Sequence, residues 1–410
     1  MKKVLILGAG TAGTIMANKL AKLLDRREWE IEVLDRNNIH YYQPGFLFIP
    51  FGIYSPADVV KKKDAFIPKN VKFTVADILS INAEENAVNL AGGETIRYDI
   101  LIVATGTVPT PSETPGLVGD RWYRNIFDFY TFEGAVALHD YLKDFRGGKL
   151  VMTITELPYK CPIAPLEFVF LADAFFTKKG IRDRVELIYT TPMSGAFTKP
   201  VATKMLSSVL AEKNINVVTD FYVEGVDEKK NVIRSYDGRE VEFDGLVVVP
   251  VNLGEEFLAS SGLVDDMSYV QVDKGTMQSV HKSNVFAIGD AANLPTSKAG
   301  SVAHFAADVL AENIVEYASG RAPSHQFDGH ANCFIETGHG KGTLIDFDYT
   351  NEPLPGMYPV PGIGPMKLLG VTRLNHWGKL AFKLIYWEFL LKNRKLPISS
   401  KFSLAGKKMV

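Results

Sequence analysis

The sequence predicts an α/β protein that contains two Rossmann-like dinucleotide-binding domains and a C-terminal region ending in an amphipathic helix. Three observations indicate this fold. A glycine-rich turn, Gly8-Ala9-Gly10-Thr11-Ala12-Gly13, follows the first apolar run. Short apolar runs, typical of parallel strands buried on both faces, recur along the chain. The C-terminal stretch combines aromatic, aliphatic and basic residues at helical spacing.

The composition is that of an ordinary globular protein and excludes several functional classes. Of the 410 residues, 46% are hydrophobic and 22% are charged, which excludes a disordered chain. The net charge of −2 gives no global electrostatic case for nucleic-acid binding. Two cysteines cannot form a disulfide framework, and no His/Cys cluster in the sequence suggests a metal site. No apolar run reaches the ~18 residues of a membrane-spanning helix, so we expect a cytosol-facing enzyme.

The first nucleotide site is expected at the glycine-rich turn. Val4–Leu7 is predicted to be a buried strand, and a helix is predicted to follow the turn. Gly8 makes the tight turn, Gly10 admits a pyrophosphate, and Gly13 lets the helix pack closely on the strand. Asp35 ends the next expected strand, 22 residues past Gly13, where it accepts hydrogen bonds from a ribose. The alternative is a coincidental strand–turn–helix.

Two further segments belong with this site. Ala104-Thr105-Gly106 follows a buried strand, and Gly289-Asp290 follows another, before a helix expected to run through Ala303 to Ile314. Together with the glycine-rich turn, they resemble the FAD-binding proteins of the two-dinucleotide-binding-domain flavoprotein superfamily. The resemblance implies that Asp290 binds the ribityl or phosphate portion of FAD. Alternatively, or in addition, Asp290 caps its helix.

A second Rossmann-like unit is expected, but without its nucleotide site. Its strands are predicted at Leu150–Thr155, Val185–Thr190 and 246–250. No glycine in Glu156–Pro162 lets a backbone approach a pyrophosphate, and no acid follows Thr190 to bind a ribose. We therefore expect that NAD(P)H does not bind here.

Cys161 occupies the turn where that nucleotide site would be. A helix follows it, with Pro162 and Pro165 in the first turn and Gly180 after the last. The helix N-terminus and the adjacent Lys160 are expected to favour the thiolate of Cys161. The alternatives are an inert buried cysteine at position 161 and, for Glu167, an acid that only complements the helix dipole.

The stretch Pro158-Tyr159-Lys160-Cys161-Pro162-Ile163-Ala164-Pro165-Leu166-Glu167 resembles the central cysteine motif of the sulfide:quinone oxidoreductases and of the related flavocytochrome c sulfide dehydrogenase flavoprotein. Ala331-Asn332-Cys333-Phe334-Ile335-Glu336-Thr337-Gly338 resembles the second cysteine segment of the same family. The resemblance implies that Cys161 and Cys333 converge on one face of the flavin, bridged directly or through added sulfur. Sulfide would attack this bridge, and Cys333 would pass electrons to the flavin. Many members have a third cysteine near Asn125–Phe129, which this chain lacks; how the sulfur chain is primed therefore stays open.

The resemblance also implies an electron acceptor and a membrane contact. It places Phe334 beside a quinone and leaves Tyr386 as a weaker quinone-side candidate. Gly356–Pro365 is expected to be an apolar loop. A helix expected over 373–394 carries one broad apolar face, which by the resemblance enters one membrane leaflet or alternatively packs on the protein itself. That face comprises Trp377, Leu380, Ala381, Leu384, Ile385 and Leu391, widened by Phe382, Tyr386 and Phe389.

Lys298 and His304, which flank the start of the helix after Asp290, are candidates for contact with flavin or substrate. For His304 an ordinary packed or solvated role is favoured.

These observations divide the chain into four segments. Residues 1–110 and 268–320 form the FAD-binding domain, 111–267 the second Rossmann-like domain, and 321–410 the C-terminal region. The expected function is oxidation of sulfide to polysulfide or sulfur, with electrons passing through FAD to a membrane quinone. The expected location is peripheral, on the cytoplasmic side of the cytoplasmic membrane, and a homo-oligomer is possible. The alternatives are a soluble flavocytochrome c-type sulfide dehydrogenase, a type II NADH:quinone dehydrogenase, and a catalytically silent flavin redox sensor.

Overall fold

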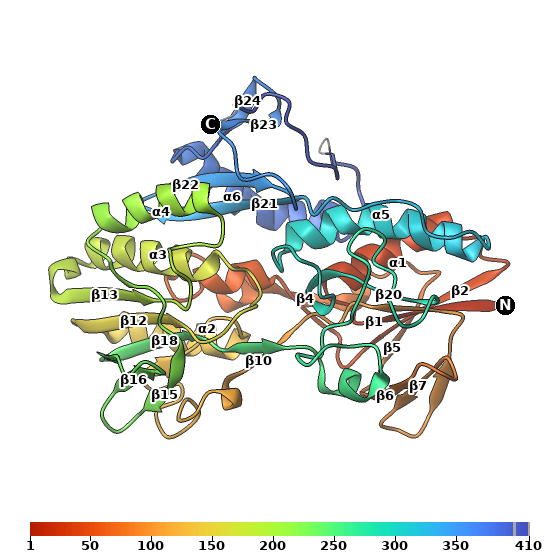
Figure 1. Ribbon diagram of the computed structural model, residues 1–410, viewed down its shortest axis with the longest axis horizontal. Coiled ribbons are helices and arrows are strands. Elements are labelled where there is room, and N and C mark those ends of the chain that lie inside the picture. The colour runs from red at the N-terminus through yellow and green to blue at the C-terminus, as the bar shows by residue number, and fades with distance from the viewer. Residues whose placement is uncertain (397–398, 409–410) are drawn as a thin grey trace.

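The computed structural model describes residues 1–396 and 399–408, and its first layer is a five-stranded parallel sheet. The strand order is β20-β9-β1-β2-β5. The last strand to join comes from far along the chain, so the polypeptide leaves this sheet and returns to it. Helices α1 (Thr11–Leu23) and α5 (Gly300–Ala318) lie side by side along it (Figure 1). The strands are β1 (Lys2–Leu7), β2 (Trp29–Asp35), β5 (Lys72–Val75), β9 (Ile100–Val103) and β20 (Val285–Ala287).

A second five-stranded parallel sheet, in the order β11-β18-β12-β13-β14, forms the other half of the molecule (Figure 1). Helix α3 (Ala164–Lys179) packs on its two central strands and ends at Gly180, whose φ of 72° is the left-handed conformation expected there. The predicted mixed α/β fold with two parallel sheets is thus confirmed. The strands are β11 (Ile126–Phe127), β12 (Gly148–Ile154), β13 (Val185–Thr190), β14 (Asn216–Val218) and β18 (Gly245–Val249).

The C-terminal region contributes a four-stranded sheet in the order β21-β22-β24-β23. Its strands are β21 (Ala331–Gly338), β22 (Lys341–Phe347), β23 (Gly356–Val360) and β24 (Gly364–Leu368). The last two were expected to be a loop, and that expectation is wrong. They pair as an antiparallel hairpin in which Pro359 lies opposite Pro365. Because the two residues that lack an N–H group face each other, only one position of the hairpin loses its hydrogen bonds. β23 is also an edge strand, where proline is tolerated.

Two helix boundaries also differ from expectation. Asp290 does not open α5, since it lies in a short 3-10 turn (Gly289–Ala291), and a loop containing Pro295 separates it from the helix. The helix expected over 373–394 is α6 (Arg373–Ile385), which continues as one π-helical stretch, Tyr386–Leu390. Its apolar residues do not share one face: Trp377 and Leu384 are exposed, while Tyr386 and Leu391 are buried in the core. The solvent-facing stripe is therefore narrower than predicted.

Small elements connect these layers. The antiparallel pair β10–β19 joins the two halves of the molecule. Among the helices of the described residues, none is both long and apolar enough to cross a bilayer. The remaining elements are α2 (Phe132–Asp144), α4 (Pro200–Glu212), β3 (Ile39–Tyr41), β4 (Val60–Lys62), β6 (Ile78–Asn82), β7 (Ala87–Leu90), β8 (Thr95–Arg97), β10 (Val108–Thr110), β15 (Val223–Asp227), β16 (Val232–Ser235), β17 (Glu240–Glu242) and β19 (Val251–Leu253).

Candidate functional site

A cavity of about 430 Å³ lies at the carboxyl ends of β1, β2 and β9 and extends to the starts of α3 and α5 and to α6. This is the edge of a parallel sheet at which ligands bind in open α/β folds. Almost every cofactor-binding residue that the sequence predicted lines it: Gly8, Gly10, Ala12, Asp35, Ala104, Thr105, Gly106, Gly289, Asp290 and Lys298. These residues come from distant parts of the sequence and meet at the carboxyl edge of the first sheet.

The glycine-rich turn has the shape that a pyrophosphate requires. Gly8 has a φ of +93°, and a side chain there would stand 2.6 Å from the carbonyl oxygen of Ala104. A Cβ on Gly13, which lies behind the cavity wall, would stand 1.8 Å from the carbonyl oxygen of Gly8. A Cβ on Gly10 would enter open space, and α1 begins directly afterwards without a side-chain cap. The first N–H groups of α1 are thus left for an anion.

Asp35 is fixed at the end of β2. Its Oδ2 accepts a hydrogen bond of 2.7 Å from the Ala9 N–H, and its Oδ1 lies 2.5 Å from Lys63 Nζ. Lys63 also donates to the carbonyl oxygen of Asn37 at 3.0 Å. Asp35 lines the cavity, as ribose binding requires. Sequence reasoning missed Lys63, because a lone lysine in a 3-10 turn carries no motif.

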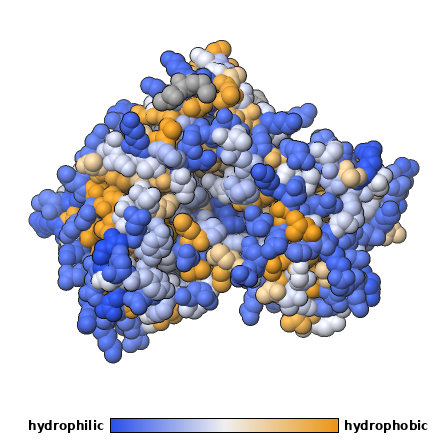
Figure 2. Space-filling model, viewed as in Figure 1, coloured by the Kyte–Doolittle hydropathy of each residue, from blue (hydrophilic) through white to orange (hydrophobic). Residues whose placement is uncertain are grey.

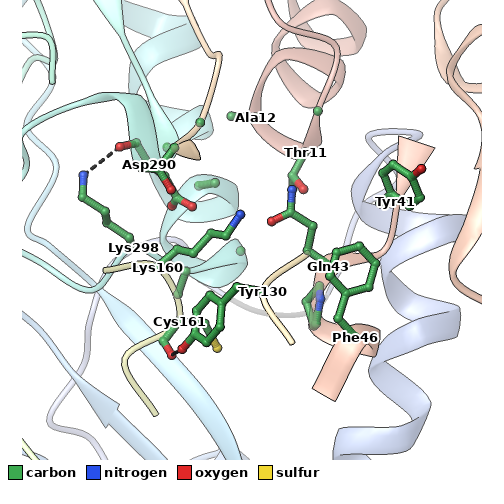
Figure 3. A pocket seen from close by; sticks show the side chains of 18 of the residues that line it. Thr11, Ala12, Tyr41, Gln43, Phe46, Tyr130, Lys160, Cys161, Asp290 and Lys298 are labelled. Carbon is green, nitrogen blue, oxygen red and sulfur yellow. Dashed lines mark hydrogen bonds between the residues drawn. The ribbon is translucent and has the colours of Figure 1, made fainter. Parts of the chain in front are cut away.

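Two polar side chains that line the cavity beside the glycine-rich turn fit a ligand that bears hydroxyl groups, such as the ribityl chain of FAD. Thr105 Oγ1 is buried and has no hydrogen-bond partner within the described residues. The Asp290 carboxylate also accepts no hydrogen bond from this part of the chain, and burial raises its pKa while the charges of Lys298 and Lys160 oppose that shift. Lys298 Nζ instead donates to the carbonyl oxygens of Asp290 and Ala292 (Figure 3). The residues present therefore fit FAD.

Cys161 lies in the loop between β12 and α3 and borders the same cavity (Figure 3). Its φ of 50° is in the left-handed region, which is uncommon for a residue with a side chain. Three hydrogen bonds hold this backbone: its N–H donates to Lys298 O at 2.7 Å, and its carbonyl accepts from Tyr130 Oη at 3.2 Å and from Ala164 N at 3.0 Å. These three hydrogen bonds fix the backbone of Cys161 in this uncommon conformation, and the backbone in turn positions the thiol.

Cys333 lies on β21, which packs against α3. Both thiols are free in this structure. Burial raises the pKa of Cys333 to about 12, and a charge on Cys161 would raise it further. Burial raises the pKa of Cys161 to about 11, and the charge of Lys379 opposes it. The expectation of a thiolate favoured by Lys160 and the helix N-terminus is therefore wrong, since burial outweighs both.

A buried network of charged residues lies beside the thiols. Lys379 Nζ on α6 lies 2.9 Å from Glu167 and donates to the carbonyl oxygen of Phe334 at 3.0 Å. Glu167 also accepts a 2.7 Å hydrogen bond from the Glu336 N–H, so it does more than complement the dipole of α3. Burial opposes the charged form of Lys379, but the negative charges of Glu167 and Cys161 outweigh burial and raise its pKa.

The outer part of this network is a carboxylate–imidazole pair. His376 Nδ1 lies 2.9 Å from both carboxylate oxygens of Glu336. Burial raises the pKa of Glu336 to about 7, although the hydrogen bond from His376 opposes this shift. Sequence reasoning missed Lys379, Glu336 and His376 as functional candidates; only the helical spacing of Lys379 and His376 could have placed these two near each other.

The remaining candidates divide between the cavity and its surroundings. Tyr386 lines the cavity, with its hydroxyl 2.8 Å from Thr11 Oγ1 and 2.6 Å from His40 Nε2. Phe334 does not line it, because its ring packs against Gly378 of α6. His304 also lies outside it, and burial lowers its pKa to about 4, in keeping with the packed role that was favoured.

Comparisons with known proteins extend over nearly the whole chain. The pyridine nucleotide-disulphide oxidoreductase family matches residues 2–151 and 170–308. The mitochondrial sulfide:quinone oxidoreductase of Dictyostelium discoideum is 29% identical over 400 residues, which cover 96% of this chain and 86% of that protein. Its counterpart in Mus musculus is 26% identical over 358 residues, covering 86% and 79%. The X-ray structure of the sulfide:quinone oxidoreductase from Aquifex aeolicus has a TM-score of 0.81 at 22% identity, covering 96% of this chain and 92% of that one.

Proposed function

Because this chain belongs to the pyridine nucleotide-disulphide oxidoreductase family, we propose that it is an FAD-dependent sulfide:quinone oxidoreductase. Relatives with that name align over most of its length. The observation that carries the proposal is the position of Cys161, which borders the dinucleotide cavity directly before α3, the helix that packs against β21 with Cys333. A pair of half-buried thiols at this place would supply sulfur chemistry next to the cofactor.

FAD would be held by the glycine-rich turn, by Asp35, and by Thr105 and Asp290, which line the same cavity. When bound, it accepts the electron pair that sulfide oxidation releases and supplies it to the second substrate. The residues of the chain would bind it and orient it toward the half-buried thiol of Cys161, which lines the same cavity.

The cysteine pair accounts for the sulfur step. In the oxidised pair, the sulfur of HS⁻ forms a bond to Cys161 Sγ and the bond between Cys161 and Cys333 breaks. Cys161 then carries the added sulfur as a persulfide, and Cys333 leaves as the thiolate with the electron pair. Lys379 favours this outcome, because its positive charge lowers the pKa of both cysteines against the effect of burial. Before a second sulfide can react, the persulfide of Cys161 and the thiolate of Cys333 must join again into a bridge that contains the added sulfur, losing one proton and the electron pair that FAD would accept. Attack of a second HS⁻ on this longer bridge would then lengthen the sulfur chain into polysulfide.

The end of the cavity next to α6 suits an apolar acceptor. Its walls are aromatic and aliphatic, and Lys379 provides one cation there. A quinone ring requires such a surface with few polar groups. Tyr386 lies at this end, although its hydroxyl already forms a hydrogen bond with Thr11. Phe334 does not line the cavity, and its ring packs against Gly378 of α6. The apolar lining residues are Tyr41, Phe46, Leu47, Phe382 and Tyr386.

A peripheral membrane contact follows from the exposed stripe of α6. Trp377 and Leu384, each 63% exposed, lie two helical turns apart, with Leu374 and Ala381 on the same side. The β23–β24 hairpin adds Val360 and Ile363, the latter 78% exposed. Figure 2 shows apolar surface gathered over this hairpin. Scattered apolar residues are normal on a surface, but a helical stripe beside an apolar hairpin tip suits insertion into one leaflet.

The local structure favours sulfide over NADH as the electron donor. In the second sheet, β12 is followed by Thr155 and Glu156 rather than by glycine, and β13 ends in Thr190 and Thr191 without an acid. A dinucleotide there would lack both its phosphate cradle and its ribose acceptor.

The test is an anaerobic comparison of the two donors with the purified protein. Sulfide should bleach the visible absorption of bound FAD, and a soluble quinone analogue should restore it. Bleaching by NADH instead would support a type II NADH:quinone dehydrogenase. Bleaching by sulfide with recovery only on addition of a cytochrome c would support the sulfide dehydrogenase, and no response to either donor would support a redox sensor.

A further inference from the structure

Lys160 is a buried lysine whose ammonium group has no partner in the protein. Its side chain is only 8% exposed and lines the cofactor cavity. Within residues 1–396 and 399–408, no hydrogen bond or ion pair reaches Lys160 Nζ, and the charges of Asp290 and Asp128 act on it only through space. A ligand that fills the cavity would remove water from this ammonium, which then needs an anionic partner to offset the loss of hydration. Its retention therefore calls for an anionic partner that binds in the cavity.

Lys298, the second lysine that lines this part of the cavity, has a structural role. Lys298 Nζ donates to two carbonyl oxygens and lies 3.7 Å from the centre of the Tyr269 ring. Its binding capacity is thus taken up by the protein. Lys160 is next to it, since the two residues form a β-bridge, yet its ammonium points into the cavity (Figure 3). The difference between two adjacent lysines indicates that Lys160 serves the ligand.

The backbone fixes where along the cofactor Lys160 acts. Cys161, the next residue, is held by the Lys298 carbonyl and by Tyr130, so the backbone of Lys160 is anchored at the thiol end of the cavity and its side chain extends from there into the cavity (Figure 3). The pyrophosphate cradle is at the glycine-rich turn, where the N–H groups of α1 already face an anion. With its pyrophosphate at that cradle, FAD would extend its ring toward the thiol end, where Lys160 begins. Two electrons and one proton leave that ring with a negative charge, and protein charges near it tune its electronics.

We propose that Lys160 is the counter-charge for the reduced ring of FAD and raises the midpoint potential of the bound cofactor. The ammonium favours the reduced, negatively charged ring over the oxidised, neutral one, and this makes electron transfer from the sulfur site easier. The proposal rests on FAD binding in this cavity, as the proposed function also does.

The experiment measures the midpoint potential of bound FAD by spectroelectrochemistry in the wild type, Lys160→Met and Lys160→Arg. Lys160→Met should bind the reduced ring at least tenfold less tightly relative to the oxidised ring, which for two electrons is a potential about 30 mV lower. Lys160→Arg, which keeps the charge, should stay near the wild-type value. Lys178→Met, at the exposed far end of α3, is the control for loss of one positive charge.

Each outcome decides the proposal. An unchanged potential in Lys160→Met overturns it, as does an equal loss of affinity for both redox states, which would assign Lys160 to the pyrophosphate. If Lys160→Met does not fold, Lys160→Gln replaces it, and an equal potential in Lys160→Gln and Lys160→Arg would be equally contradictory. Failure of the wild type to bind FAD would instead refute the proposed function, so the two failures are distinguishable.

Discussion

The hydroxyl of Tyr386, at the end of the C-terminal helix, lies 2.8 Å from Oγ1 of Thr11, in the glycine-rich turn at the start of the chain. The same hydroxyl lies 2.6 Å from the buried ring of His40. Tyr386 is 2% exposed, and Trp387 and Leu390 are buried beside it. The helix that presents an apolar stripe to the outside is thus attached by its other side to the cofactor cradle.

This attachment predicts the effect of Tyr386→Phe. The substitution leaves Thr11 Oγ1 and His40 Nε2 without their shared partner in a buried site, so we expect a loss of about 1–3 kcal/mol in the free energy of unfolding, together with faster FAD release. Urea unfolding and the rate of FAD loss on dilution measure these effects. Tyr236→Phe, at a tyrosine that is 75% exposed, is the matched control. Equal stability of the two variants would show that the Tyr386 bonds contribute nothing.

Lys379 is expected to set the reactivity of the cysteines. Lys379→Met removes the charge that opposes the effect of burial on Cys161, and it leaves Glu167 without its cation. The pKa of Cys161 should rise further above about 11, so alkylation by iodoacetamide in a Cys333→Ser background should slow about tenfold per pKa unit at a fixed pH. Lys379→Arg should retain most of the rate. A pH profile that is the same in all three proteins would remove Lys379 from this role.

Glu336 predicts a pH dependence of stability. Its pKa is raised from 4.5 to about 7 by burial, so the folded state binds its proton more tightly than the unfolded state does. The contribution to stability is fully present below pH ~4.5 and is lost as the pH rises through ~7. The free energy of unfolding of the wild type should therefore fall between pH 5 and pH 8, by on the order of 2 kcal/mol more than that of Glu336→Gln, which has no carboxyl group to ionise. Parallel stability curves from urea unfolding at both pH values would contradict this assignment.

The exposed stripe of α6 predicts a membrane contact that point substitutions can test. Deletion of residues 373–410 would also remove Tyr386 and Leu391 from the core, so it would confound membrane binding with unfolding. Trp377→Glu combined with Leu384→Glu should reduce flotation with phosphatidylcholine–phosphatidylglycerol vesicles at least tenfold without loss of FAD, because two carboxylates would enter the leaflet. Val280→Glu, at an exposed position outside the stripe, is the control. Unchanged flotation of the double variant would place the contact elsewhere.

Local patterns were sufficient where one segment carries the whole signal. One cavity is lined by the glycine-rich turn, Asp35, Ala104-Thr105-Gly106 and Asp290, because the carboxyl ends of parallel strands meet at one sheet edge. The β23–β24 hairpin was missed because its prolines and glycines suit a loop, and only the pairing of Pro359 with Pro365 makes them compatible with strands. The exposed apolar face predicted for α6 is too wide, because helical periodicity does not show which apolar side chains are buried against the rest of the protein.

Charged networks were beyond sequence reasoning for a related reason. Lys379, Glu336 and His376 become a unit only because α6 crosses β21 in three dimensions, and Lys63 meets Asp35 across a turn. The pKa of Cys161 illustrates the same point. A helix N-terminus and a neighbouring lysine suggested a thiolate, whereas the degree of burial, which the sequence does not give, dominates the pKa.

The central claim is that sulfide reaches FAD only through the two cysteines, and the rate of anaerobic FAD bleaching by sulfide in single-cysteine variants tests it most directly. Stopped-flow mixing should show rapid bleaching in the wild type. Cys333→Ser and Cys161→Ser should retain the yellow colour of bound FAD and lose at least about a hundredfold in rate, because neither can form the bridge that sulfide attacks. Wild-type bleaching in either variant would contradict the account.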